Sequence, residues 1–362
     1  MWEQKICAGT YKVQKGVQVE KIIKLQQKVV PELIDLLEKR HDILRMICYN
    51  QPIGRRILAD HMCISERIIR NEINFLKSQN LIEVNALGMF ITSEGEDVIN
   101  QLKGFIHEIK GLSKIEKFIE KHLKLQQVIV VPGDVETDKS VLKELGKAAA
   151  SYAMDVIRDN SIIALTGGST VKEVVDSFLP NKKYNNILVL PARGGMARNV
   201  DIQANTLVAR LADKIGGNYE LLHVPDNLSN AALETILNEK NIINIIEKIR
   251  NADILIYGIG VANEMALKRG LPQKVIAELE EVGAVGEAFG EYYNEVGKKI
   301  YTVPTIVVKN EDDKNNKILI AVAAGKSKAK AIIATEINCS STVLVIDEAA
   351  AVEIVNILEK IE

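Results

Sequence analysis

The sequence predicts an α/β protein in two parts, an N-terminal winged helix-turn-helix followed by a doubly wound, mostly parallel sheet. Three observations carry this prediction. The first part of the chain spaces its apolar residues as helices do, and from residue 128 onward short continuous apolar runs alternate with helical stretches. Several of these runs end in glycine-rich or basic loops, as strands do at a ligand site. The length of 362 residues, 47% of them hydrophobic, allows about two domains.

Charge is divided unevenly between the two parts. Residues 1–80 carry 14 Lys and Arg against 9 Asp and Glu, a net of +5, whereas the remainder carries 32 against 39, a net of −7. The N-terminal part, here called the head, is basic, and the rest of the chain, here called the body, is acidic. This division fits a head that binds DNA, although the charge bias is mild. The net charge of −2 for the whole chain neither favours nor excludes nucleic acid.

Composition also indicates where the protein is located and which cofactors it needs. The chain has no apolar run of about 18 residues and no secretory pattern at its start, which predicts a soluble, cytoplasmic protein with no membrane contact. No metal-ligand spacing is recognised, and neither a metal nor a cofactor is expected. The cysteines form no C-x-x-C pair and are interpreted as reduced thiols: Cys7, Cys48, Cys63 and Cys339.

The head is expected to start after an extension. Residues 1–20 show no clear periodicity, and residues 1–24 are expected to form an extension, disordered or not, ahead of a DNA-binding domain at 25–110. An apolar stripe over 21–48 predicts one helix or two, with Pro31 near a helix start. Such a stripe is usually core or a dimer contact.

The pattern of a helix-turn-helix follows this stripe. Helices are expected at 41–49, at 55–62 and from Ser65, as N-cap, to about Ser78. The third helix is expected to bury four apolar residues, namely Ile68, Ile69, Ile73 and Leu76.

A wing and a connecting helix complete the head. Residues 81–84 and 89–91 predict the two strands of the wing. Thr92 is expected to cap a further helix. One connecting helix is expected over about 102–125, with the linker between the domains placed at 111–126.

The effector domain is placed at 127–362. Its apolar runs are those of parallel strands buried on both faces, so ligands are expected at the carboxyl ends of the strands. Strands are expected at 128–131, 162–165, 187–190, 221–224, 254–257, 318–322 and 343–346.

The third helix of the head carries donors suited to reading bases in the major groove. Arginine pairs bidentately with guanine and asparagine with adenine. Arg55 and Arg56, at the start of the second helix, are expected to hold phosphates. The alternative is an ordinary solvated helix face. The outward set consists of Ser65, Glu66, Arg67, Arg70, Asn71 and Asn74.

Two loops of the body have features suited to holding phosphate. The first, residues 166–170, opens a helix with Gly168, Ser169 and Thr170, whose N–H and hydroxyl groups are anion donors. The second, residues 324–328, opens a helix with three lysines, which the helix dipole disfavours unless an anion sits there. The alternatives are a tight turn for the first loop and a solvated lysine cluster for the second.

Further polar groups follow other strands. Arg193 follows the strand at 187–190 and is a natural oxyanion ligand, and Lys268 and Arg269 lie beyond the glycines of 258–260. Two phosphate loops with hydroxyl-binding groups between them suggest a ligand phosphorylated at both ends. The candidate hydroxyl-binding groups are Gln203, Asn205 and Glu287.

These motifs together resemble the SorC-type sugar-binding transcriptional regulators over about residues 25–362. The most specific stretches are Pro52-Ile53-Gly54-Arg55-Arg56, Ile64-Ser65-Glu66-Arg67, Thr166-Gly167-Gly168-Ser169-Thr170, Pro191-Ala192-Arg193-Gly194-Gly195, Gln203-Ala204-Asn205, Glu287-Ala288-Phe289-Gly290 and Ser327-Lys328-Ala329.

The resemblance implies a repressor of an operon for central glycolytic enzymes, induced by fructose 1,6-bisphosphate. It also implies an effector domain similar to sugar-phosphate isomerases, and a homo-oligomer, a dimer of dimers on paired operator sites of double-stranded DNA.

The resemblance also implies roles for single residues. One phosphate is bound by Gly168, Ser169 and Thr170, with help from Arg193. The sugar is faced by Gln203 and Glu287. The other phosphate is bound by Lys328 and Lys268. Two positions depart from the family pattern: lysine stands at 268 where arginine is expected, and serine at 169 where threonine is expected. A lysine cannot grip an anion bidentately, so either affinity is lower or Arg269 substitutes.

Two other functions remain open at this point. The first is a phosphosugar isomerase, although the chain shows no nucleophile–base pair, no catalytic residue is assigned, and His223 is interpreted as a packed core histidine. The second is a regulator of the same family that reads a different phosphosugar.

Overall fold

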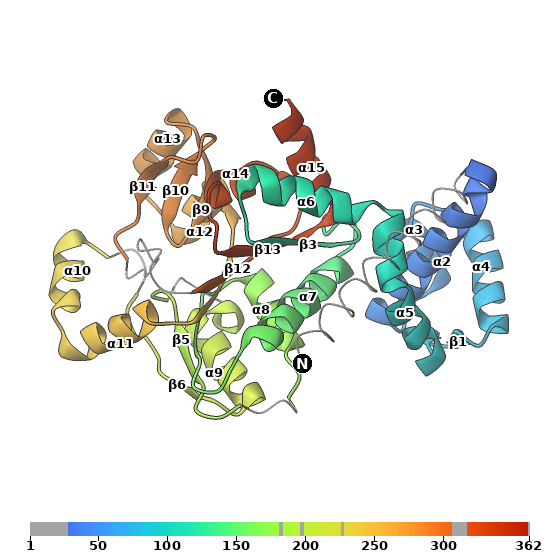
Figure 1. The fold of residues 1–362 in the computed structure, drawn as a ribbon, viewed down its shortest axis with the longest axis horizontal. Helices are drawn as coiled ribbons and strands as arrows, with labels where there is room; N and C mark the ends of the chain where they lie inside the picture. The colour runs from blue at the N-terminus through green and yellow to red at the C-terminus, as the bar shows by residue number, and fades with distance from the viewer. Residues whose placement is uncertain (1–27, 181–183, 196–198, 226–227, 306–316, 361–362) are drawn as a thin grey trace, which may run out of the picture. The chain divides into compact units, whose positions relative to one another are not determined.

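The computed structural model describes residues 28–180, 184–195, 199–225, 228–305 and 317–360. The chain divides into two compact units, Met1–Ser113 and Lys114–Glu362 (Figure 1). The extension expected at 1–24 lies outside the described residues. No helix among the described residues is both long and apolar enough to cross a membrane.

The first unit is a winged helix-turn-helix, as predicted. Pro31 is the first residue of α2, and the two wing strands pair antiparallel. Apolar residues of the three helices and the wing form one core, with Ile43, Ile47 and Leu58 fully buried. The elements are α2 (Pro31–Asn50), α3 (Arg55–His61), α4 (Glu66–Ser78), β1 (Ile82–Asn85), β2 (Gly88–Ile91) and α5 (Ser93–Ile109).

Of the two helix caps and the four buried residues predicted in the head, some are confirmed and some are not. Thr92 caps α5, because its hydroxyl accepts a hydrogen bond from the N–H of Gly95 at 3.0 Å. Ser65 occupies the N-cap position of α4 without a side-chain cap hydrogen bond. The inward placement of Ile68 was wrong, since it is 43% exposed, whereas the other three residues of its set are buried.

The continuous helix expected over 102–125 is also wrong. Helix α5 ends at Ile109, and α6 (Leu112–Leu123) starts after a break at Gly111. Gly111 has a φ of +66°, the left-handed conformation in which helices commonly end and which glycine adopts without strain.

The second unit is built on a seven-stranded parallel sheet in the order β3-β13-β12-β7-β4-β5-β6 (Figure 1). The order runs outward in opposite directions from β4 and β7, so these neighbours form the topological switch point. The strands are β3 (Gln127–Val131), β4 (Ile162–Leu165), β5 (Leu188–Pro191), β6 (Asn218–Tyr219), β7 (Ile254–Gly258), β12 (Ile318–Val322) and β13 (Thr342–Asp347).

Helices cover both faces of this sheet. Its main core lies between the sheet and α7, α8 and α9, and α14 and α15 lie on the other side (Figure 1). Glu116 and Glu120 of α6 accept hydrogen bonds from the N–H groups of Val130 and Val128, which satisfies the open edge of β3. These helices are α7 (Ser140–Val156), α8 (Ser169–Ser177), α9 (Ala204–Ile215), α14 (Ala329–Glu336) and α15 (Glu348–Glu359), while α10 (Asn230–Leu237) and α11 (Lys240–Arg250) precede β7.

A second, antiparallel sheet was not foreseen. It has the order β11-β10-β9-β8 and shares a small apolar core with α12 (Ala262–Arg269) and α13 (Gln273–Glu281). Its strands are β8 (Gly260–Val261), β9 (Ala284–Ala288), β10 (Glu291–Asn294) and β11 (Lys299–Thr302).

One predicted strand is absent from the sheet. Residues 221–224 form no strand, and the edge strand is the exposed pair Asn218–Tyr219. The backbone of Leu222 instead exchanges two hydrogen bonds with the carboxamide of Asn205. This pairing occupies Asn205, which had been expected to bind sugar hydroxyls.

Candidate functional sites

A pocket lies at the switch point of the parallel sheet. The loops after β4, β5 and β7, together with α12, β9 and the turn after β12, bring distant residues to one cavity. Seven of the eight expected ligand residues line it, and Gln203 does not. The lining is Thr166, Gly167, Gly168, Ser169, Thr170, Val171, Arg193, Ile202, Gly258, Ile259, Gly260, Glu264, Met265, Lys268, Glu287, Phe289 and Lys328.

The loop after β4 has the geometry of an anion-binding turn. Gly168 adopts a φ of +122°, and a Cβ at Gly167 would lie 2.6 Å from the carbonyl oxygen of Ile202, so both positions require glycine. Helix α8 begins at the next residue. The N–H groups of its first turn have no intrahelical acceptor, and the helix dipole favours an anion there.

Arg193 is held at the pocket by the loop after β5. The neighbouring Ala192 donates its N–H to the carbonyl of Leu165 at 2.8 Å, which ties this loop to β4. A Cβ at Gly194 would lie 2.7 Å from the carbonyl oxygen of Val224, so the chain passes too closely for another residue. Arg193 itself is buried, and the guanidinium matches the geometry of a phosphate.

Gln203 lies beside the pocket rather than in its wall. It occupies the N-cap position of α9, directly after the short 3₁₀ turn Val200–Ile202. A Cβ built on Gly195 would lie 3.1 Å from the Oε1 of Gln203. Its amide therefore packs against the loop that carries Arg193.

Glu287 supplies the acidic group of the pocket. It is buried on β9, and its Oε1 accepts hydrogen bonds from the Nη2 of Arg269 and from the N–H of Gly290. Arg269 is not among the pocket-lining residues. Its side chain is 0% exposed and paired with Glu287.

Two lysines stand together in the pocket wall. Lys268 is 64% exposed and lies 3.5 Å from the carboxylate of Glu264. Burial lowers the pKa of Lys328, nearby Lys268 lowers it further, and Glu264 and Asp347 oppose both effects. An anion placed between the lysines would relieve their repulsion.

The loop after β12 departs from the expected phosphate cradle. The residues 326–328 form a 3₁₀ turn before α14, and the N–H and hydroxyl of Ser327 both donate to Oε1 of Glu136, at 3.0 and 2.7 Å. These bonds lower the pKa of Glu136. The N–H of Gly325 donates to the carboxylate of Asp347 at 3.0 Å. The anions at this turn are therefore the protein's own side chains.

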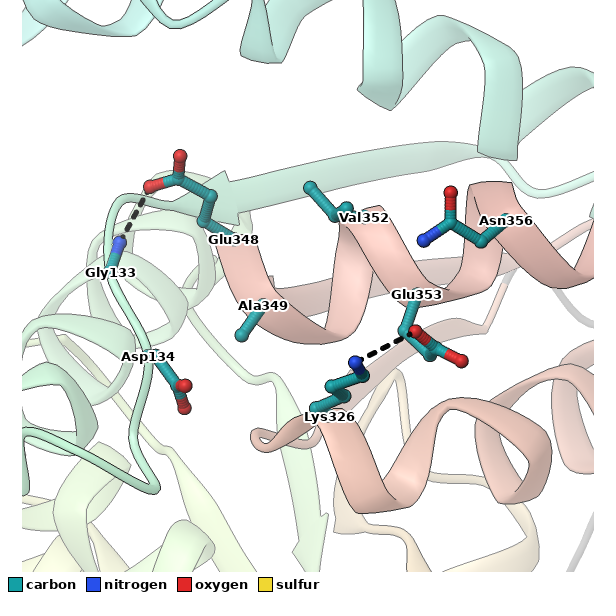
Figure 2. A pocket seen from close by; sticks show the side chains of 8 residues that line it. All are labelled: Gly133, Asp134, Lys326, Glu348, Ala349, Val352, Glu353 and Asn356. Carbon is teal, nitrogen blue, oxygen red and sulfur yellow. Dashed lines mark hydrogen bonds and ion pairs between the residues drawn. The ribbon is translucent and has the colours of Figure 1, made fainter.

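The two lysines of this turn and Lys330 of α14 have different surroundings. Lys328 lines the pocket, whereas Lys330 pairs with Glu295 on the surface. Lys326 lines a second, more open hollow beside α15, where it pairs with Glu353 at 3.4 Å (Figure 2).

This second hollow is acidic. Asp134, Glu348 and Glu353 line it together with a single lysine, and the N–H of Gly133 already donates to Glu348 at 2.9 Å (Figure 2). Like charges would repel a phosphate there. Of the two hollows, the pocket at the switch point is the one whose lining suits an anion.

The head presents the expected polar face to solvent. Arg67, Arg70, Asn71 and Asn74 follow the spacing of one helix face. All six residues expected to contact DNA are exposed: Arg55, Arg56, Ser65, Arg67, Arg70 and Asn71.

The opposite side of α4 is fastened to α2. Glu72 pairs with Lys39 at 2.7 Å and with Arg40 at 2.8 Å, and the guanidinium of Arg40 stacks over Phe75. Burial acts to raise the pKa of Glu72, but the hydrogen bonds from Lys39 and Arg40 outweigh it and lower the pKa. These contacts fix which face of α4 is turned outward.

The histidine at 223 and three of the four cysteines lie in the described part of the chain. No group of three or more His, Cys, Asp or Glu residues that could hold a metal ion occurs there. His223 is exposed, which corrects its interpretation as a packed core histidine, and it does not line the pocket. Cys48, Cys63 and Cys339 form no disulfide among the described residues.

Comparison with known proteins assigns both units. The family model described as "Putative sugar-binding domain" matches residues 107–356, and the model described as "CggR N-terminal DNA binding domain" matches residues 36–106. The chain is 40% identical over 335 residues to the central glycolytic genes regulator of Priestia megaterium, covering 92% of this chain and 98% of the relative.

Two further comparisons agree with this one. The central glycolytic genes regulator of Bacillus subtilis is 38% identical over 333 residues, covering 92% of this chain and 98% of the relative. The solved structure of a "putative SorC family transcriptional regulator from Enterococcus faecalis" is 34% identical with a TM-score of 0.62, covering 67% of this chain and 99% of that one.

Proposed function

Since this chain belongs to the SorC-type sugar-binding transcriptional regulators, we propose that it represses an operon of central glycolytic enzymes and that fructose 1,6-bisphosphate releases it from its operator. The chain is a transcriptional regulator with a DNA-binding and a sugar-binding domain, not an enzyme. The operon, the effector and the direction of control are the proposed part.

One observation carries the proposed effector. A single pocket joins an anion-binding helix start with Arg193 to a lysine pair, Lys268 and Lys328, and to the carboxylate of Glu287. Cations suit phosphates, and a carboxylate suits hydroxyl donors. This set of groups supports a sugar carrying a phosphate at each end.

The head supplies the DNA contacts of the proposal. The outward face of α4 enters the major groove, with Arg67 and Arg70 as base readers and Arg55 and Arg56 on the backbone. We propose that the regulator binds as a homo-oligomer, a dimer of dimers, because paired operator sites require paired heads. Inducer affects DNA affinity only if the DNA-bound and released states bind it differently.

The first test is thermal stability against fructose 1,6-bisphosphate, fructose 6-phosphate, glucose 6-phosphate, ribose 5-phosphate and free fructose. A ligand at about one hundred times its dissociation constant adds roughly 2.7 kcal/mol, a shift of several degrees. We expect the largest shift with the bisphosphate, and the same ligand should release operator DNA in a mobility-shift assay. A flat response to the bisphosphate would refute the proposed effector.

A sugar monophosphate is the second candidate effector. Lys268 is largely exposed and already pairs with Glu264, and the N–H groups of Gly325 and Ser327 are bonded to carboxylates. These contacts leave the lysine end of the pocket less prepared for an anion than the Arg193 end. A larger stabilisation by fructose 6-phosphate than by the bisphosphate would favour this candidate.

Arg67→Ala tests the DNA half of the proposal. Loss of a bidentate base contact costs about 1–3 kcal/mol of discrimination, so operator affinity should fall about tenfold or more. Ligand binding should stay at the wild-type level. Unchanged operator affinity would show that α4 does not read DNA through this residue.

A further inference from the structure

We propose that Arg269 is a positioning residue that fixes Glu287 as the hydroxyl acceptor of the pocket, so that Arg269 sets preference for a hydroxylated ligand without touching it. This inference rests on the proposed function only in taking the ligand to be a phosphorylated sugar. The residues that carry this inference lie on three elements: Arg269 at the end of α12, Glu287 on strand β9 and Gly290 in the turn that follows β9.

The two carboxylate oxygens of Glu287 have different surroundings. Oε1 accepts hydrogen bonds from the Nη2 of Arg269 and from the N–H of Gly290, the latter at 2.5 Å. Oε2 lies near Gly260 and Met265 of the pocket wall: a Cβ built on Gly260 would lie 3.7 Å from it and 2.2 Å from the Cγ of Met265. Because Glu287 lines the pocket and its Oε1 is held by the protein, we infer that Oε2 is the oxygen that meets the ligand.

The ion pair between Arg269 and Glu287 is buried. The side chain of Arg269 is 0% exposed and that of Glu287 is 3% exposed. A guanidinium does not lose its proton in proteins, and an ionised carboxylate only accepts hydrogen bonds. Oε2 therefore selects a donor such as a hydroxyl and repels a phosphate or carboxylate oxygen.

The backbone around the pair is held on both sides. Arg269 is the last residue of α12, and Gly270 ends that helix with a φ of +68°. Phe289 and Gly290 link β9 to β10 with φ values of +57° and +83°, the pattern of a type I′ hairpin turn. This turn aims the N–H of Gly290 at Glu287.

The turn itself is anchored in the main sheet. The ring of Phe289 packs on Tyr257 with ring centroids 4.5 Å apart, and the hydroxyl of Tyr257 donates to the buried Glu336 at 2.8 Å. A bulky residue rarely adopts a positive φ unless its surroundings impose it. The anchoring keeps Glu287 at one place in the pocket.

Adjacent residues 268 and 269 therefore have separable roles. Successive residues on a helix point about 100° apart. Lys268 lines the pocket and is exposed, so its effect falls on a ligand phosphate. Arg269 lies behind Glu287, so its effect falls on a ligand hydroxyl.

Isothermal titration with two ligands separates these roles. Fructose 1,6-bisphosphate carries hydroxyls between its phosphates, and hexane-1,6-diol bisphosphate carries none. For Arg269→Met the uncompensated charge of Glu287 should weaken the binding of both bisphosphates, and we expect the sugar to lose about tenfold more affinity than the diol ligand, since hydrogen bonds to charged groups are worth about 1.5–3 kcal/mol. The matched control Lys268→Met should weaken both ligands by the same factor. Arg269→Lys, which restores the charge, should recover part of the sugar affinity.

Arg269→Met leaves a buried carboxylate without its cation and can fail to fold. The double variant R269M/E287M removes both charges at similar volume and should bind the two ligands with equal affinity. Equal weakening of both ligands in either variant would reduce Arg269 to a structural role, and full sugar preference in the double variant would overturn the role of Glu287. If the wild type binds neither bisphosphate, the proposed effector is overturned instead.

Discussion

The loops after β4 and β12 look alike in sequence and differ in the structure. Each follows a buried apolar strand of the parallel sheet. Each turns at a glycine with a strongly positive φ, +122° at Gly168 and +107° at Gly325. Each then starts a helical segment with a hydroxyl near its beginning, on Ser169 and Thr170 after β4 and on Ser327 after β12.

The difference lies in which groups meet the N–H groups of the turn. After β4 the helix start faces the pocket, next to Arg193. After β12 the Ser327 N–H and hydroxyl are bonded to Glu136, and Gly325 is bonded to Asp347. A helix start requires an acceptor, and the tertiary structure decides whether a ligand or a side chain supplies it.

Arg193→Ala should show the largest effect, because it removes the cation beside the first loop. We expect about a hundredfold loss of bisphosphate affinity by titration calorimetry, with operator binding retained and induction abolished. Lys326→Ala is the matched control beside the second loop, since Lys326 pairs with Glu353 outside the pocket. An intact inducer response in the Arg193 variant would refute the assignment of Arg193 to the ligand.

Alanine at the two turn glycines compares the loops directly. Both glycines combine a positive φ with an extended ψ, a region in which an L-residue costs about 1–3 kcal/mol. Gly168→Ala meets no atom within 4 Å, so the strain should distort the loop and weaken ligand binding about tenfold. Gly325→Ala would place its Cβ 3.0 Å from the Oε1 of Glu136. It should lower the free energy of unfolding and leave ligand affinity unchanged. Equal losses of affinity would mean that both loops bind the ligand.

The sequence predicted strands best where both faces are buried. The expected runs 162–165 and 318–322 coincide with β4 and β12, because a buried parallel strand is a continuous apolar run. The run 221–224 is interrupted by His223, and its backbone bonds to Asn205 and Gly195 instead of to a strand. The antiparallel strands were missed because they are short and mix polar with apolar residues, as Gly260–Val261 and Glu291–Asn294 do.

Residue types in the pocket were predictable, but their pairings were not. Arginine and lysine after strand ends indicated an anion site, and the structure brings Arg193, Lys268 and Lys328 together. Nothing in the sequence distinguishes Lys268 from Arg269, because only the packing of α12 decides which of them faces the ligand. The Glu136–Ser327 contact joins residues 191 positions apart, beyond the reach of any local pattern.

A pH titration should show a smaller effect at the lysine end of the pocket. Because burial and Lys268 lower the pKa of Lys328, this ammonium loses its proton at a lower pH than usual. Phosphates are dianionic above about pH 7. Bisphosphate affinity should therefore fall several-fold as the pH rises from about 7 to about 10.

Lys328→Arg is the control for this titration, since an arginine stays charged and should flatten the profile. The stability of the ligand-free protein changes in the opposite direction. A lysine with a lowered folded pKa binds more protons in the unfolded state, so its contribution to stability rises with pH. A wild-type affinity that is flat across this range would place the phosphate away from Lys328.

Glu136→Gln should have the smallest effect and is the direct test of the second loop. Its two hydrogen bonds from Ser327 resemble those of a helix cap, so the substitution should cost about 1 kcal/mol or less, a few degrees in melting temperature. Because these bonds lower the pKa of Glu136, the stabilisation is complete above its ordinary value of about 4.3 and is lost as the pH falls. The wild type and the variant should therefore converge in acid.

Ligand affinity in the same variant separates two descriptions of the loop. If Glu136 only fastens the turn after β12 to the segment after β3, bisphosphate affinity stays within about twofold of wild type. If the ligand phosphate competes with Glu136 for the N–H of Ser327, removing the carboxylate charge should tighten binding about tenfold. The contacts of Ser327 and the absence of Ser327 from the pocket lining favour the first description. Tighter binding in the variant would mean that both loops bind phosphate, and that in the loop after β12 the phosphate displaces the side chain of Glu136.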